Sequence, residues 1–179
     1  MRRRTLLVVA LGVLALAALV GATTASAASP HFKRGSPTFT DNGLTLTASG
    51  DIAGLGNGDI RIIVLASGTP TAGCVNPGTG EHRPGGQQPA QVVSGQVDIP
   101  GDQVKNGTLN FSVTTLPPTA PTSAKAAGCP NNNWTVVIDD VSFTGQTLCV
   151  YQDAINDGVY NSPSPLVLQS GPLTCPATA

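Results

Sequence analysis

The stretch GLTLTASGDIAGLGNGDIRIIVLASG, residues 43–68, decides the fold class of this chain. Its first part, residues 44–49, alternates apolar and polar side chains, which is the period-2 pattern of a half-buried strand. The glycine-rich segment 51–59 is typical of a turn, and residues 60–66 form a nearly continuous β-branched and apolar run. We therefore expect two strands here, the second of them at the centre of a sheet.

Further short strand patterns follow, and no segment has a helical period; the patterns lie at residues 93–99, 109–113, 134–143, 147–151 and 166–168. Asn106-Gly107 and Thr144-Gly145 are typical turn pairs, and a change of apolar parity predicts a bulge near Asp139-Asp140. Residues 68–89 and 116–133 are interpreted as two long loops. The sequence thus predicts an all-β fold, an immunoglobulin-like antiparallel β-sandwich of about seven strands.

The N-terminus has the pattern of a secretory signal peptide over residues 1–28. Arg2, Arg3 and Arg4 form a positive region, residues 6–20 are apolar or small, and Ala25-Ser26-Ala27 fits a cleavage site. The apolar run is too short to span a membrane, and the mature chain contains no other candidate span. We expect a secreted, extracellular protein whose single domain covers residues 29–179.

The charge balance argues against nucleic-acid binding. Without the three signal-peptide arginines, six basic residues face ten acidic ones, and only 11% of all residues are charged. A mildly acidic chain with scattered cations lacks the basic surface that nucleic acids require.

Four cysteines, at positions 74, 129, 149 and 175, predict two disulfides in an exported protein. Three pairings are open. We favour Cys74–Cys129, since both lie in Gly-Cys segments of the long loops, and Cys149–Cys175, which would tie down the tail. No Cys-x-x-Cys or Cys-x-x-His spacing supports a zinc site instead.

The loop 73–89 is the strongest candidate for a functional segment. It carries Glu81, His82 and Arg83 among glycines and prolines, and we interpret it as a candidate binding loop. Tyr160 is added to these residues as a candidate contact for a ligand or partner. No Gly-x-Ser-x-Gly or His-Glu-x-x-His motif accompanies it, so we assign no catalytic residue and no cofactor.

Other chemistry-bearing residues give weaker signals. Asp153, Asn156 and Asp157 follow part of a calcium-loop pattern, but the third position and the closing glutamate are missing, so a turn is the simpler interpretation. Trp134 shares the parity of Val136, which predicts a core position.

The segment SPHFKRGSPTFTDNGLTLTASGDIAGLGNGDIRIIVLASG, with the later GCVNPGTG, resembles small exported proteins of high-GC Gram-positive bacteria. Its part GLTLTASGDIAGLGNGD is also similar to the opening of the neocarzinostatin-type apoproteins. That second resemblance implies a secreted immunoglobulin-like sandwich with two disulfides and a cleft that holds a small chromophore.

Three hypotheses on function follow. The first is a non-catalytic protein with a structural, envelope-associated or protein-binding role, whose partner is an extracellular protein, a cell-wall component or a second copy of itself. The second is a carrier of a small ligand of the chromophore type. The third is an extracellular hydrolase with a site assembled from residues distant in sequence.

Overall fold

Strands account for every regular element longer than three residues in the computed structural model, which describes residues 29–153 and 166–177. They are β1 (His31–Phe32), β2 (Thr38–Asp41), β3 (Leu46–Ala53), β4 (Ile60–Val75), β5 (His82–Gln87), β6 (Gln91–Ile99), β7 (Thr108–Thr114), β8 (Thr135–Gln152) and β9 (Leu166–Ser170), with one 3₁₀ turn, η1 (Gly101–Gln103), before β7. The two antiparallel sheets confirm the all-β sandwich, with nine strands in place of about seven.

The smaller sheet is built around β3. It pairs with β1 and β2 on one side and with β7 on the other, all antiparallel. Alternation along β3 turns Leu46, Ala48 and Ile52 inward, while the side chains between them stay partly exposed. The half-buried strand expected at 44–49 is thus confirmed with shifted bounds: it begins at Leu46 and continues to Ala53, into the segment 51–59 that was interpreted as a turn.

The larger sheet is built around β4 and β8, which pair from Ile60↔Gln152 to Val75↔Thr135. β6 lies along the first half of β4, β5 lies along its second half, and β9 lies beside β8. The first half of β4 is buried at nearly every position, because one face packs in the core between the sheets and Leu173 and Cys175 cover Ile63 and Leu65 on the other face.

The main core fills the space between the two sheets. Its buried members come from β3, β4, β6, β7 and β8 and from the loops beside them, namely Leu46, Ala48, Ile52, Leu55, Ile60, Ile62, Val64, Ala66, Val93, Ile99, Val104, Leu109, Phe111, Val113, Leu148 and Val150. Burial of one such side chain stabilises the fold by roughly 1.5–3 kcal/mol.

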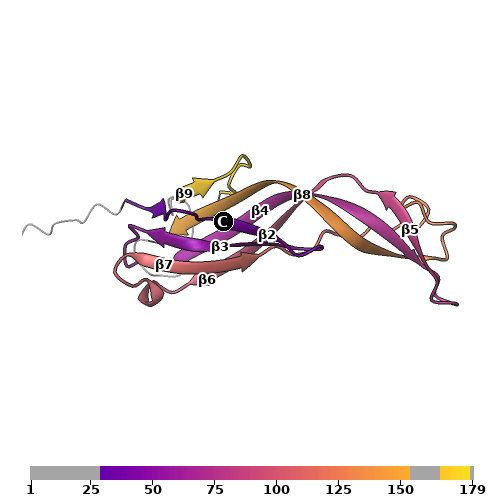
Figure 1. Cartoon of the computed structure of the whole chain (residues 1–179), viewed down its shortest axis with the longest axis horizontal. Helices are drawn as coiled ribbons and strands as arrows, with labels where there is room; N and C mark the ends of the chain where they lie inside the picture. The colour runs from indigo at the N-terminus through magenta and orange to yellow at the C-terminus, as the bar shows by residue number, and fades with distance from the viewer. Residues whose placement is uncertain (1–28, 154–165, 178–179) are drawn as a thin grey trace, which may run out of the picture.

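The larger sheet extends beyond the sandwich. There the second half of β4, β5 and the start of β8 form a three-stranded ribbon, and the loop after β7 lies against it. Figure 1 shows the sandwich at one end of an elongated molecule and β5 at the other. We call this extension, residues 70–90 and 117–140, the arm.

Two sequence interpretations of the larger sheet are wrong. Residues 68–89 are not one loop, because residues 68–75 complete β4 and residues 82–87 form β5. Thr144-Gly145 is not a turn between two strands, because β8 continues through it. Gly145 has a φ of 61° and lies where the register shifts from Leu65↔Thr147 to Ser67↔Thr144. A left-handed glycine serves a bulge as readily as a turn, so the sequence signal was ambiguous.

The bulge expected near Asp139-Asp140 is confirmed. Thr71 pairs with Asp140 and the next residue, Ala72, pairs with Ile138, so Asp139 is the additional residue. A bulge re-aims the side chain of the residue that it inserts.

Both expected disulfides are confirmed, Cys74–Cys129 in the arm and Cys149–Cys175 at the tail. The tail lies on the outer face of the larger sheet, where Leu173 and Cys175 pack against Ile63, Leu65 and Tyr151. Two disulfides fit an oxidising location. Within the described ranges, no helix has the length and hydrophobicity needed to cross a membrane.

Candidate functional site

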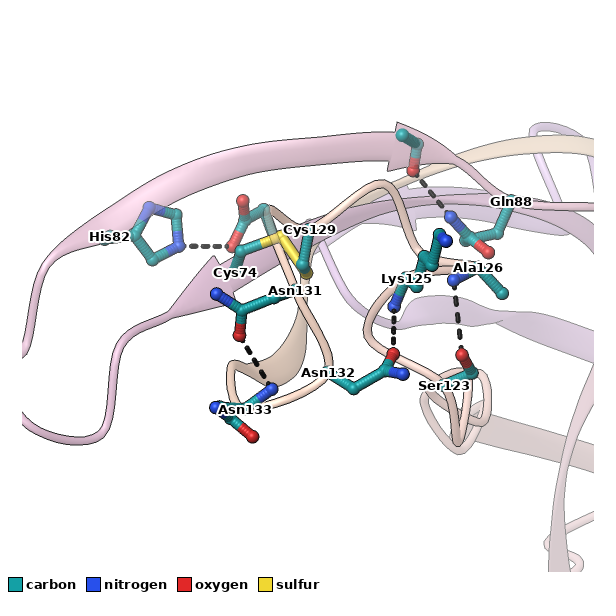
Figure 2. The surroundings of a disulfide bond; sticks show 12 residues. Cys74, His82, Gln88, Ser123, Lys125, Ala126, Cys129, Asn131, Asn132 and Asn133 are labelled. Atoms are coloured by element: carbon teal, nitrogen blue, oxygen red, sulfur yellow. Dashed lines mark hydrogen bonds and ion pairs between the residues drawn. A yellow bond between two sulfur atoms is a disulfide. The ribbon is translucent and has the colours of Figure 1, made fainter.

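The arm has a small core of its own, separate from that of the sandwich. Ala72 and Cys74 of β4 are fully buried against Ala124, Ala127 and Cys129 of the loop after β7, and Trp134 and Val136 pack around them. The Cys74–Cys129 disulfide joins β4 to the loop after β7, with a Cα–Cα distance of 5.6 Å (Figure 2). Since three of the five buried residues are alanines, which bury little apolar surface, we expect the disulfide to contribute much of the stability that keeps the loop on β4.

Glycines allow the loop to approach β5 closely. The N–H of Gly86 donates to the carbonyl of Ala127 over 2.7 Å. A Cβ on Gly85 would lie 2.8 Å from the carbonyl oxygens of both Ala127 and Ala72. A side chain at position 85 would therefore separate the loop from the ribbon.

Short side chains then fix the course of the loop itself. Asn132 Oδ1 accepts from the N–H of Lys125 over 3.2 Å, Ser123 Oγ accepts from that of Ala126 over 3.3 Å, and Asn131 Oδ1 accepts from that of Asn133 over 2.9 Å (Figure 2). Each of these hydrogen bonds satisfies a backbone N–H that lies outside the strands and has no partner in a β-sheet, as in other Asx and Ser/Thr turns.

The outer end of the arm carries a polar cluster, which we call the arm tip: Glu81, His82, Arg83, Trp134 and Asp139. His82 Nε2 lies 3.0 Å from Asp139 Oδ1, and Arg83 Nε donates to Glu81 Oε1 over 2.7 Å. The guanidinium of Arg83 also lies over the Trp134 ring, 5.6 Å from its centroid. The cluster thus pairs His82 and Arg83 each with a carboxylate and adds one aromatic face.

Two features bring Asp139 to His82: the bulge in β8, which turns its side chain, and Gly73 in β4, which leaves room for its carboxylate. A Cβ on Gly73 would lie 2.3–2.6 Å from the carboxylate atoms of Asp139, so the carboxylate occupies the space that a side chain would fill. Any larger residue at position 73 would displace Asp139 away from His82.

The hairpin before β5 holds Glu81 in place. The N–H of Asn76 donates to the carbonyl of Glu81 over 2.8 Å, and Asn76 Oδ1 accepts from the N–H of Gly78 over 2.9 Å. The ion pairs themselves are exposed, and such pairs contribute only about 0.2–1 kcal/mol each. They therefore orient the side chains of the arm tip more than they stabilise the fold.

The residues proposed from sequence are only partly brought together. Glu81, His82 and Arg83 lie side by side at the arm tip, while Tyr160, Asn156 and Asp157 lie outside the described residues. Asp153 is buried, and its N–H donates to the carbonyl of Asp59 over 2.8 Å.

Sequence reasoning missed Asp139 and misplaced Trp134. Trp134 is not in the main core; it is half-buried in the small cluster of the arm. It does lie on the same face as Val136, but this part of the chain extends beyond the sandwich, so that face meets the arm cluster and not the main core. The predicted bulge at Asp139 was the one signal that its side chain is unusual, but its partner is 57 residues away. Across the described ranges, no group of three or more His, Cys, Asp or Glu side chains is placed to hold a metal ion.

A second feature is an open groove of about 570 Å³ on the outer face of the larger sheet, lined by Ile63, Leu65, Ser94, Gly95, Gln96, Thr114, Leu116 and Pro176. A smaller hollow of about 170 Å³ adjoins it, and both are lined by Ser94 and Leu116. No residue of the arm tip lines either one.

No protein-family model, no curated protein and no solved structure matches this chain.

Proposed function

We propose that this chain is a secreted, non-catalytic binding protein that contacts a component of the cell envelope, or a protein attached to it, through the arm tip. The observation that carries the proposal is the position of the tip. A single β4–β8 ladder runs from the sandwich into the arm, and the Glu81–Arg83 pair and Trp134 lie at its outer end.

The composition of the tip supports recognition of a partner. Arginine and tryptophan are the side chains that most often dominate binding energy, and here they are stacked before any partner arrives. Because the disulfide and the Asn76 hairpin hold the tip in place, little conformational entropy would be lost on binding.

The surroundings of His82 support a non-catalytic role. In the part of the chain that the structure describes, its ring bonds to a carboxylate and to no serine or cysteine side chain that could act as a nucleophile. Both members of the His82–Asp139 pair are also partly exposed to solvent, at 50% and 32% of their side-chain surface, and line neither the groove nor the smaller hollow of the described residues.

Binding to isolated cell walls of a high-GC Gram-positive bacterium, measured by co-sedimentation of the purified mature protein, tests the proposal. Arg83→Ala should weaken binding at least tenfold, or by about 1.4 kcal/mol. Arg34→Ala, which removes an exposed arginine from the turn between β1 and β2, is the matched control and should bind as the wild type does. Equal binding by both variants would reject the arm tip as the contact surface.

Two alternative functions have tests of their own. The 570 Å³ groove is of the size that holds small ligands, which favours a carrier. A carrier would leave its host with a bound mass that is lost on denaturation. A hydrolase would have to use the His82–Asp139 pair as its base, and would lose turnover in His82→Ala.

A further inference from the structure

Two of the most exposed large apolar side chains lie together, outside the arm tip. Leu116 is 72% exposed and Val92 is 68% exposed, and both line the smaller hollow. Single exposed apolar side chains need no explanation, but two adjacent ones beside an apolar groove are typical of an interaction surface. The groove floor is formed by Ile63 and Leu65, which remain less than 10% exposed.

Leu116 is held rigidly although it is exposed. The residue before it, Thr115, is buried and exchanges two hydrogen bonds with the backbone of Leu46, one through its N–H and one through its Oγ1. The N–H of Leu116 itself donates to the carbonyl of Ser94 over 2.9 Å. A leucine that protrudes from a fixed backbone loses little entropy when a partner covers it.

The segment after Leu116 is fixed as well. Pro117 and Pro118 restrict the backbone, and the side chain of Gln91 on β6 bonds to both the N–H and the carbonyl of Thr119, over 3.2 and 3.0 Å. The apolar protrusion and the groove beside it are therefore two parts of one ordered surface.

We propose that this surface binds a second copy of the chain in a two-fold dimer, in which Leu116 of each copy enters the groove of the other. An isologous contact requires one patch that carries both a protrusion and a matching recess. Leu116 provides the protrusion, and the adjoining groove, with Ile63 and Leu65 as its floor, provides the recess.

Charge also favours a second copy. Without the signal-peptide arginines the chain has six basic and ten acidic residues, yet among the residues that the structure describes none that lines either hollow is ionisable. Two copies of this patch can therefore meet without opposing like charges, which elsewhere on an acidic surface would repel them. A small ligand fits less well, because ligand pockets enclose most of their occupant and Leu116 projects outward instead.

Sedimentation equilibrium of the mature, disulfide-bonded protein tests the dimer over concentrations from about 1 μM to about 1 mM. We expect concentration-dependent dimers for the wild type. Leu116→Asp should raise the dimer Kd about a hundredfold or more, because the change occurs twice in a two-fold interface. Leu116→Ser is the milder variant, and neither change should impair folding, since the side chain is exposed.

Leu44→Asp is the matched control, because Leu44 is also an exposed leucine, at 38%, but lines neither hollow. It should dimerise as the wild type does. Methyl NMR signals of Ile63 and Leu65 should shift with concentration in the wild type and in Leu44→Asp, and stay constant in Leu116→Asp.

A wild-type protein that remains monomeric up to about 1 mM would overturn the proposal. So would a Leu116→Asp variant that dimerises with wild-type affinity. Monomeric protein that binds a neutral apolar dye in the groove would point to a small-ligand site instead. None of these outcomes bears on the arm tip, whose residues lie outside both hollows, so the cell-wall experiment remains an independent test.

Discussion

The phenolic hydroxyl of Tyr151 donates a hydrogen bond to the carbonyl oxygen of Pro176, one residue beyond the Cys149–Cys175 disulfide. Tyr151 is almost completely buried, and this burial raises its pKa above the ordinary value of 10.0. The neutral phenol, together with the disulfide, therefore holds the tail on the outer face of the larger sheet.

Tyr151 should make the stability depend on pH in the alkaline range. Below pH 10.0 its contribution is fully present. Above that pH the unfolded phenol loses its proton while the folded one keeps it, so the free energy of unfolding should fall until the folded pKa is passed. Urea unfolding of the wild type and Tyr151→Phe, from about pH 8 to about pH 11, measures this contribution.

Every other ionisable group is present in both proteins, so the difference between them isolates Tyr151. At neutral pH the Phe variant should be about 0.5–1.5 kcal/mol less stable, because it lacks the bond to Pro176. Parallel pH profiles for the two proteins would contradict a raised pKa.

The Cys74–Cys129 disulfide should stabilise the arm and leave the sandwich largely independent of it. It closes 55 residues, and such a loop corresponds to about 4 kcal/mol in the chain-entropy model. Replacing both cysteines by alanine should expose the small arm core, while the separate main core keeps its contacts. Hydrogen exchange should accelerate in β5 and change little in β3.

The second disulfide provides the control for that experiment. Cys149→Ala with Cys175→Ala should release the tail from Ile63 and Leu65 without affecting exchange in β5. If the Cys74/Cys129 variant instead loses protection equally in β3 and β5, the arm and the sandwich unfold as one cooperative unit.

The sandwich strands from β3 onward could be predicted, because their side chains alternate between core and solvent or, in the first half of β4, form a continuous apolar run. The short strands β1 and β2 were not predicted. The second half of β4 could not be predicted, since Gly68, Pro70 and Gly73 are residues that usually interrupt strands. Two of them have packing reasons visible only in three dimensions. A Cβ on Gly68 would lie 2.8 Å from a methyl carbon of Val141, and Gly73 accommodates the Asp139 carboxylate.

The sites depend on register, which a single sequence does not specify. His82 meets Asp139 only because β5 and β8 both pair with β4 in this arm, although 57 residues separate them. The groove likewise combines β4, β6, the end of β7 and the tail. The disulfides were predictable because four paired cysteines allow only three connectivities.

Replacing Gly95 by alanine should both destabilise the fold and change the shape of the groove, which Gly95 lines. A Cβ at this position would lie 1.9 Å from the carbonyl oxygen of Thr114 and 2.9 Å from the Cα of Thr115. These are backbone atoms, which cannot rotate away as a flexible side chain would. Gly95→Ala must therefore separate β6 from residues 114–116, at a cost of about 1–3 kcal/mol.

The urea midpoint of Gly95→Ala should fall accordingly, with an unchanged m value. Because Leu116 is anchored through Thr115 and Ser94, the variant should also weaken the proposed dimer. Gly78→Ala is the matched control, because its Cβ would meet only the side chain of Asn76 at 3.4 Å, and its stability should stay within about 0.5 kcal/mol of the wild type. A Gly95→Ala protein as stable as Gly78→Ala would mean that β6 and the segment carrying Leu116 do not approach so closely, and the rigid protrusion would lose its support.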